Sequence, residues 1–170
     1  MLPRSAPKAA GPVLTVMAYN VPGFNDCPKC VVATIRQPGA DLVTLQELSP
    51  AVAAEIAWDL SSEYPCRVLN PQEQVFGSGA IRRLPMRATG ETLPGDWVGQ
   101  PQIPALTFAD ANVLVVNAHP YATGPTDLET VRWSIRERFR QAQTLVAFAQ
   151  THHDPLLYPG DSNTTDQNDA

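Results

Sequence analysis

Short apolar runs alternate along the chain with polar segments and with segments that contain glycine and proline. Runs at 13–19, 41–46, 113–118 and 156–158 have the length and composition of strands. The run at 113–118 is almost continuously apolar, which predicts a strand that is covered on both faces. Weaker strand patterns lie at 66–69, 79–82 and 103–108, and we expect the last two to be antiparallel neighbours.

Helical patterns lie between these runs. Ser49 followed by Pro50 is typical of an N-cap and a first helical position, so a helix is predicted over 51–60. A shorter helix is predicted over 30–36. Thr126 has the capping-box spacing to Glu129 and predicts the start of a long amphipathic helix. Apolar residues recur in it every three or four positions and predict the side that faces the core: Leu128, Val131, Ile135, Phe139, Ala142, Val146 and Ala149.

The other side of this long helix is charged. Its charged residues are Arg132, Arg136, Glu137, Arg138 and Arg140. They could face a phosphate-bearing ligand, but a helix face of this kind is more often simply solvated. We favour the solvated interpretation.

Length and composition agree with a single domain. A chain of 170 residues that is 44% hydrophobic and 17% charged can bury a sizeable core. Residues 1–12 are rich in proline and alanine and lack the apolar region of a signal peptide, so we expect a flexible lead-in before a domain at 13–170. No run reaches the roughly 20 apolar residues of a membrane-spanning helix, so we expect no membrane span and, by default, a cytoplasmic chain.

The charge balance bears on the partners of the protein. A net charge of −5 argues against a protein that holds nucleic acid through a broad basic surface. A metal ion could still supply positive charge locally, so the acidic balance weakens a nuclease function without excluding it.

Two of the three cysteines form the motif Cys27-Pro-Lys-Cys30, and Cys66 stands alone. A redox pair or half of a metal site is possible on this spacing, but no second Cys-x-x-Cys exists. We therefore favour ordinary thiols. The adjacent His152 and His153 lack the spacing that would let both complete a zinc site.

Polar residues follow the four clearest apolar runs. Asn20 follows the first, Glu47 the second, His119 the third, and Asp161 with Asn163 the fourth. Each has an ordinary interpretation by itself, such as a turn residue or a surface acid. In layered α/β proteins, however, ligands gather where strands end, and the joint placement predicts a single site.

The residue types suit phosphoryl chemistry. Magnesium takes oxygen ligands and needs only one or two protein carboxylates. Glu47 fits the carboxylate role, and Asn20 can add an amide oxygen or orient Glu47. His119 can donate to a phosphoryl oxygen as negative charge builds, and Asp161 and Asn163 can position an attacking water.

Five segments closely resemble the endonuclease/exonuclease/phosphatase superfamily, in order, from residue 13 to about residue 165. This family includes deoxyribonucleases, sphingomyelinases, inositol polyphosphate phosphatases and exported bacterial phosphoesterases. The Leu-Gln-Glu and Gly-Asp-x-Asn elements make the resemblance specific. The segments are Leu14-Thr-Val-Met-Ala-Tyr-Asn20, Asp41-Leu-Val-Thr-Leu-Gln-Glu47, Gly79-Ala-Ile-Arg-Arg-Leu-Pro85, Val116-Asn-Ala-His119 and Gly160-Asp-Ser-Asn163.

The resemblance implies a fold, a cofactor and a function. The fold is an α/β (α+β) four-layer sandwich, with two mixed β-sheets packed face to face and helices outside. Glu47 would bind Mg²⁺ or Mn²⁺ with help from Asn20, and His119 would contact the phosphate. Asp161 and Asn163 would flank the nucleophilic water. The substrate would be a phosphoester in a small molecule, a lipid-linked phosphate or a nucleic acid.

The chain also departs from the family pattern. The family continues to a Ser-Asp-His element whose histidine acts as general base or phosphate contact, and no such element follows Asn163. We therefore expect a C-terminally incomplete domain that lacks its last strands. The alternative function is a catalytically weak or inactive relative that binds metal or phosphate only. If the chain is a fragment of a membrane-anchored relative, it would be exported.

Overall fold

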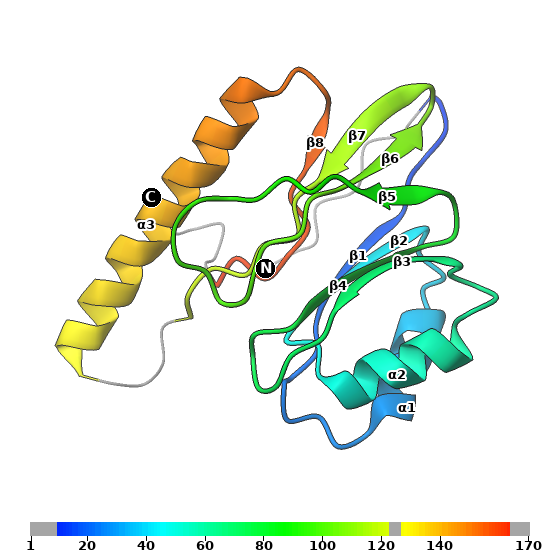
Figure 1. Ribbon diagram of the computed structural model, residues 1–170, viewed down its shortest axis with the longest axis horizontal. Coiled ribbons are helices and arrows are strands. Elements are labelled where there is room, and N and C mark those ends of the chain that lie inside the picture. Colours follow the sequence, from blue (N-terminus) through cyan, green and yellow to red (C-terminus); the bar gives the residue numbers. More distant parts are fainter. Residues whose placement is uncertain (1–9, 123–126, 164–170) are drawn as a thin grey trace.

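A computed structural model describes residues 10–122 and 127–163, which form two four-stranded sheets (Figure 1). The predicted lead-in lies outside the described residues up to residue 9. The first sheet has the order β1 (Val16–Asn20), β2 (Leu42–Gln46), β4 (Ser78–Arg82), β3 (Cys66–Asn70). The second has the order β5 (Met86–Ala88), β6 (Pro104–Phe108), β7 (Ala111–Val115), β8 (Leu156–Leu157). Both sheets are mixed, because β1 and β2 are parallel, as are β7 and β8, and the other pairs are antiparallel.

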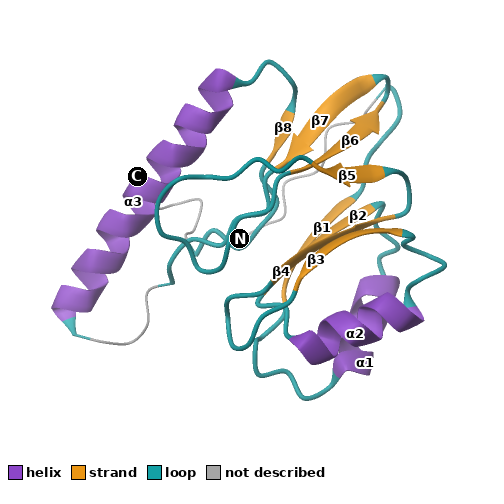
Figure 2. Ribbon diagram, viewed as in Figure 1, coloured by secondary structure: helices purple, strands orange, loops and turns teal. Residues whose placement is uncertain are grey.

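Helices lie outside the two sheets. Helices α1 (Pro28–Arg36) and α2 (Pro50–Asp59) cover one face of the first sheet, and α3 (Leu128–Thr151) runs beside the second (Figure 2). This confirms the predicted α+β sandwich of mixed sheets with outer helices. Among the described residues, no helix is long and apolar enough to cross a membrane.

The alternation of side chains along β2 explains the layers. Val43 and Leu45 are buried in the cluster that α1 and α2 form with the first sheet. Leu42 points the other way and packs against residues of the second sheet, among them Val115. The opposite side of β7 carries Leu114, which packs in a third cluster with side chains of α3. Strands that are covered on both faces therefore read as continuously apolar runs, as the sequence at 113–118 predicts.

Helix α2 begins as expected. The Oγ atom of Ser49 accepts a hydrogen bond from the N–H of Val52 at 3.4 Å, and Pro50 is the first helical residue. Helix α1 begins two residues earlier than predicted, at Pro28, because proline is favoured in a first helical turn where no backbone donor is needed.

Cys27 and Cys30 are joined by a disulfide at the start of α1. The interpretation of these residues as ordinary thiols is therefore wrong. Cys66 is a free thiol on β3.

The orientation of α3 differs from the prediction. Leu128, Ile135, Phe139 and Val146, from the predicted buried side, are exposed, whereas Ser134 and Gln141 are buried. A second line of side chains, which includes Leu145 and Phe148, packs on the second sheet instead. The helix tolerates this because its inward polar groups find partners: the amide of Gln141 donates to the Asp96 carbonyl at 2.7 Å and accepts from the Tyr121 N–H at 3.2 Å.

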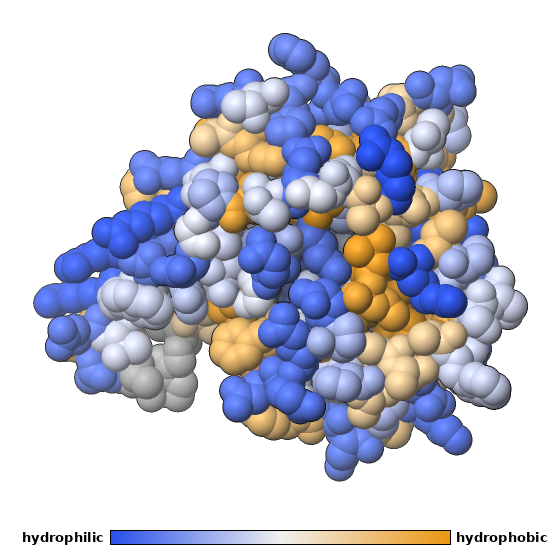
Figure 3. Space-filling view, in the orientation of Figure 1, coloured by the Kyte–Doolittle hydropathy of each residue, from blue (hydrophilic) through white to orange (hydrophobic). Residues whose placement is uncertain are grey.

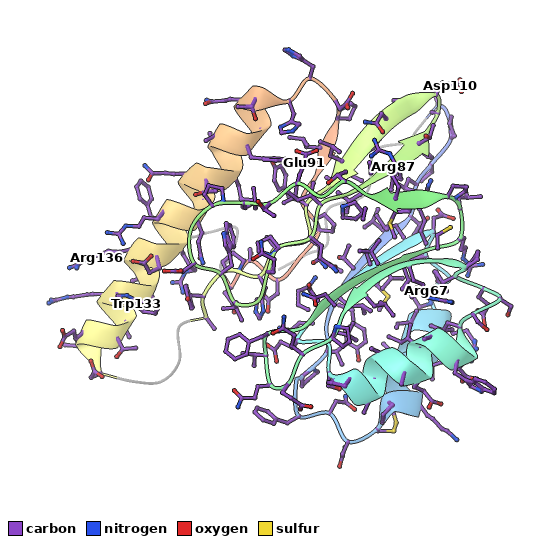
Figure 4. The ribbon with its side chains drawn as sticks, viewed as in Figure 1. Arg67, Arg87, Glu91, Asp110, Trp133 and Arg136 are labelled. Carbon is purple, nitrogen blue, oxygen red and sulfur yellow. A yellow bond between two sulfur atoms is a disulfide. The ribbon has the colours of Figure 1, made fainter. Side chains whose placement is uncertain are left out.

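The start of α3 is capped by a polar side chain, and its exposed surface carries arginines as well as apolar side chains. Asp127, and not Thr126, is the N-cap: its carboxylate accepts from the N–H groups of Glu129 and Thr130, and Thr126 lies outside the described residues. Arg132 and Arg136 are exposed, and Arg136 extends away from the sheets (Figure 4). In Figure 3 hydrophilic residues cover the outer edge of α3. Arg132, Arg136 and Arg140 are thus exposed, as favoured above, whereas Arg138 is half-buried and donates to the Tyr121 carbonyl at 3.1 Å.

The predicted pairing of 79–82 with 103–108 is wrong. Strand β4 pairs with β2 and β3 in the first sheet, whereas β6 pairs with β5 and β7 in the second. The two segments face each other across the sandwich. Arg82 of β4 donates to the backbone carbonyl of Thr107 on β6 at 2.9 Å, which is a contact between sheets and not within one.

Candidate metal and phosphate site

Glu47 lies directly after β2 in a left-handed backbone conformation, with φ of 58°. Residues other than glycine adopt this conformation at some cost, and such residues cluster at functional sites. The carboxylate accepts two hydrogen bonds at 3.0 Å, one to Oε1 from the side-chain amide of Asn20 and one to Oε2 from the backbone N–H of Gly23. Strand β1 and the loop that follows it therefore hold the Glu47 carboxylate in a defined orientation.

Asn20 also holds a second carboxylate. Its Nδ2 donates to Asp161 Oδ2 at 2.9 Å, in addition to its bond to Glu47. Its Oδ1 is buried and has no hydrogen-bond partner among the described residues. One amide group thus joins two carboxylates from distant parts of the chain, and an amide oxygen beside them remains unused.

Asp161 and Asn163 lie in the turn that follows β8. The Asp161 carboxylate accepts the N–H of Asn163 at 2.9 Å, and the Asn163 amide donates to the Pro120 carbonyl at 2.8 Å. Gly160 allows the turn to approach the segment after β7, because a Cβ atom there would lie 2.4 Å from the Ala118 carbonyl oxygen. The Gly-Asp-x-Asn element is therefore fastened beside the segment that carries His119.

His119 completes the group from the side of the second sheet. Its side chain is 7% exposed, and its Nε2 lies 3.9 Å from Glu47 Oε1. Its Nδ1 is buried and has no partner within residues 10–122 and 127–163. Burial lowers the pKa of His119 below its ordinary value of 6.5, and this outweighs the opposite effects of the Glu47 and Asp161 carboxylates. The imidazole is therefore neutral at pH 7.

Asp161 is ionised. Burial acts to raise its pKa, but hydrogen bonds from Asn20 and from the Asn163 N–H, together with the proximity of His119, lower the pKa below its ordinary value of 3.8. The site therefore carries a carboxylate charge beside a neutral imidazole.

A buried polar pair underneath the site was not singled out by the sequence analysis. Gln46 precedes Glu47, and its amide donates to Asn117 Oδ1 at 2.7 Å. Asn117, two residues before His119, donates to the backbone carbonyls of Leu45 and Gly79 at 3.2 and 3.0 Å. The signal that could have found the pair is an amide within each of two otherwise apolar strand segments.

The donor set suits a divalent cation that prefers oxygen ligands. Two carboxylates and an unpaired amide oxygen are the ligand types that Mg²⁺ and Mn²⁺ take, and one or two carboxylates suffice. Among the described residues, no three histidine, cysteine or acidic side chains gather as they would in a closed site made by protein alone. The residues thus fit a hard cation that keeps waters or substrate oxygens as further ligands.

No family model matches the sequence, and no curated protein does so either. Solved structures do match. Danio rerio TDP2 complexed with single-strand DNA product superimposes with a TM-score of 0.68 at 17% identity, and the match covers 90% of this chain and 62% of that one. Sphingomyelinase C from Streptomyces griseocarneus gives a TM-score of 0.71 at 18% identity, covering 94% and 67%.

A β-hairpin deletion mutant of the β toxin of Staphylococcus aureus gives a TM-score of 0.69 at 14% identity, covering 92% of this chain and 69% of that one. The chain has the endonuclease/exonuclease/phosphatase fold. Identities this low establish the fold and not the activity. The chain spans 48–64% of the length of the TDP2 chains that it matches.

Proposed function

We propose that this protein hydrolyses a phosphoester with water at the site formed by Glu47, Asn20, His119, Asp161 and Asn163. One observation carries the proposal. The carboxylates of Glu47 and Asp161 accept from the same Asn20 amide, at 3.0 and 2.9 Å, while the imidazole of His119 lies 3.9 Å from Glu47. This arrangement gathers negative charge, an amide oxygen and a hydrogen-bond donor at one place where strands end.

Glu47 and Asn20 are the residues proposed to hold Mg²⁺ or Mn²⁺. The Asn20 oxygen has no partner among the described residues, and a hard cation would supply one. Such an ion, when bound, lowers the pKa of water and polarises phosphoryl oxygens. Gly23 fixes the second carboxylate oxygen of Glu47 and so limits the directions from which Glu47 can bind an ion.

Asp161 and Asn163 are proposed to orient the attacking water and the phosphate. The lowered pKa of Asp161 keeps this carboxylate ready to accept a hydrogen bond from water at neutral pH. His119, being neutral, would donate from Nε2–H to a phosphoryl oxygen as charge develops there. A donor already in place costs no reorganisation in the transition state.

The substrate class remains broad in this proposal. Structures with this fold include a sphingomyelinase C and TDP2 with a single-strand DNA product, so a phosphoester in a lipid, a small molecule or a nucleic acid is compatible with it. The net charge of −5 favours recognition near the reacting phosphate over a broad electrostatic contact with nucleic acid.

The test is hydrolysis of bis(p-nitrophenyl) phosphate and p-nitrophenyl phosphate with Mg²⁺, with Mn²⁺ and with chelator. We expect metal-dependent turnover that falls about a hundredfold in His119→Ala, since one donor to developing charge contributes that much. His153→Ala, at an exposed histidine, is the matched control and should retain full turnover. Turnover that persists in chelator, or that survives His119→Ala, would contradict the proposal.

A second candidate is binding of metal or phosphate without turnover. It is favoured by the observation that this chain covers only 48–64% of the TDP2 chains that it matches. Metal binding that depends on Glu47, with no turnover of either ester, would select this second candidate over the first.

A further inference from the structure

The loop of residues 21–27 joins β1 to α1 and supplies the backbone N–H that binds Glu47. Directly after this loop, Cys27 and Cys30 are joined by a disulfide. We propose that this disulfide is a thiol–disulfide exchange site for a dithiol reductant, and that it fastens the loop that orients Glu47. The proposal does not depend on the hydrolytic function, because both of its parts can be measured without turnover.

The disulfide is accessible. Cys30 is exposed and Cys27 half-buried, in the first turn of a helix on the outside of the first sheet. Their Cα atoms are 5.3 Å apart, within the ordinary range for a disulfide. A dithiol can therefore reach the sulfur of Cys30 without unfolding the domain. The free Cys66, half-buried on β3, is an internal reference.

The disulfide is expected to contribute little to the stability of the whole domain. It links residues separated by only three positions in the sequence. The stabilisation expected from a disulfide grows with the length of chain that it closes, so such a small ring constrains the unfolded chain little. The effect of the disulfide should therefore be local, on the residues next to it.

The neighbouring residues lead directly to Glu47. The N–H of Cys27 donates to Asn25 Oδ1 at 2.7 Å, and the N–H of Asn25 donates to the Pro22 carbonyl at 2.7 Å. Gly23, which follows Pro22 in the sequence, donates its N–H to Glu47 Oε2 at 3.0 Å. These short-range bonds fold residues 22–27 into a compact turn with the disulfide at one end and the Glu47 contact at the other.

Gly23 has little room to move without changing this contact. A Cβ atom on Gly23 would lie 2.0 Å from the Gln74 carbonyl oxygen, so the loop is pressed against the backbone of residues 74–75. A turn this tightly seated transmits a change at Cys27 to the Glu47 carboxylate. Cys27 is also the N-cap of α1 and makes no side-chain capping hydrogen bond, so the disulfide is its main side-chain restraint.

The exchange proceeds through two displacements at sulfur. A thiolate of the dithiol attacks Cys30 Sγ, the bond between the two protein sulfurs breaks, and Cys27 leaves as a thiolate. The second thiol of the reagent then displaces Cys30 and forms the reagent's own disulfide. Two electrons and two protons pass from the dithiol to the cysteine pair.

The first experiment counts thiols in the folded protein with a maleimide, before and after equilibration with dithiothreitol. The air-oxidised protein should be labelled at Cys66 alone, and the reduced protein at all three cysteines while its circular dichroism is unchanged. In Cys66→Ser, labelling should go from none to two. Labelling of Cys27 or Cys30 in the oxidised protein, or reduction that requires urea, would overturn the exchange site.

The second experiment measures amide hydrogen exchange by nuclear magnetic resonance on metal-free protein in both redox states. Reduction should accelerate exchange of the Gly23 amide by about tenfold, as expected when a local closed state is loosened. The turn at Ala109 and Asp110, in the second sheet, should not change. The double variant Cys27→Ser/Cys30→Ser should match the reduced protein with or without dithiothreitol. Equal Gly23 exchange in both redox states would overturn the link between the disulfide and Glu47.

Discussion

Gln46 and Asn117 are joined by a hydrogen bond of 2.7 Å that crosses from the first sheet to the segment after β7. Each residue lies next to a proposed ligand in sequence: Gln46 precedes Glu47, and Asn117 comes two residues before His119. The pair therefore sets the position of the Glu47 side of the site relative to the His119 side. Because this hydrogen bond is buried, competing water does not weaken it.

Asn117→Ala should destabilise the protein by roughly 2–4 kcal/mol, because it leaves the Gln46 amide and the carbonyls of Leu45 and Gly79 buried without their partner. Urea unfolding followed by circular dichroism measures the loss. Asn112→Ala, at a nearby position where the side chain bonds Asp154 near the surface, is the control and should cost less than about 1 kcal/mol. Equal losses in the two variants would show that Asn117 does not join the sheets as described.

Gly160→Ala should displace the turn that carries Asp161. The added Cβ would lie 2.4 Å from the Ala118 carbonyl oxygen, which belongs to the backbone and cannot rotate away. We expect a loss of about 1–3 kcal/mol in the free energy of unfolding, as for other overpacked sites. Gly11→Ala, where a Cβ would meet no atom within 4 Å, should be neutral. A Gly160→Ala protein as stable as the wild type would contradict the close approach of this turn to Ala118.

The end of α3 should make stability depend on pH. A hydrogen bond to the Phe148 carbonyl and the contact with Glu91 at 2.8 Å raise the pKa of His152 above 6.5, although burial opposes the shift. Glu91 lies in the loop after β5, on the side facing α3 (Figure 4). The stabilisation from His152 is therefore complete below pH 6.5 and is lost as the pH rises through the raised pKa.

The measurement is the urea midpoint of the wild type and of His152→Gln between pH 5 and pH 9. The difference between the two proteins should shrink as the pH rises above 6.5. The comparison with a variant is needed because His119, whose pKa burial lowers, has the opposite effect, and its contribution is lost as the pH falls below 6.5. A difference that is constant over this range would contradict the assigned role of His152.

Several features could be predicted because a local pattern sufficed. The strands were recognisable as short apolar runs, and a polar residue at the end of each run indicated where ligands gather. Glu47 and Asp161 both lie within hydrogen-bond distance of Asn20 in the structure. Ser49 and Pro50 set the start of α2 because capping is a local property.

Other features depend on contacts between distant segments. Helix α3 has apolar residues on more than one side, and the buried side is decided by backbone groups that satisfy Gln141 and by packing of Phe148. The N–H of Gly23 leaves no signal in the sequence, since every residue except proline has that donor. The spacing of Cys27 and Cys30 is compatible with a redox pair, a metal ligand pair or free thiols, and the free thiols that the sequence favoured are wrong because the fold brings the two sulfurs into a disulfide.

The most direct test is titration of metal-free protein with Mn²⁺ by calorimetry, for the wild type, Glu47→Gln and Glu73→Gln. Glu73 is an exposed carboxylate that serves as the matched control. In Glu47→Gln the new amide would point a donor at Asn20 or Gly23, both of which already donate there. We predict one ion per wild-type chain, unchanged affinity in Glu73→Gln, and affinity at least about tenfold weaker in Glu47→Gln. An equal loss of Mn²⁺ affinity in both variants, or an affinity that is unchanged in Glu47→Gln, would contradict the assignment of this metal site.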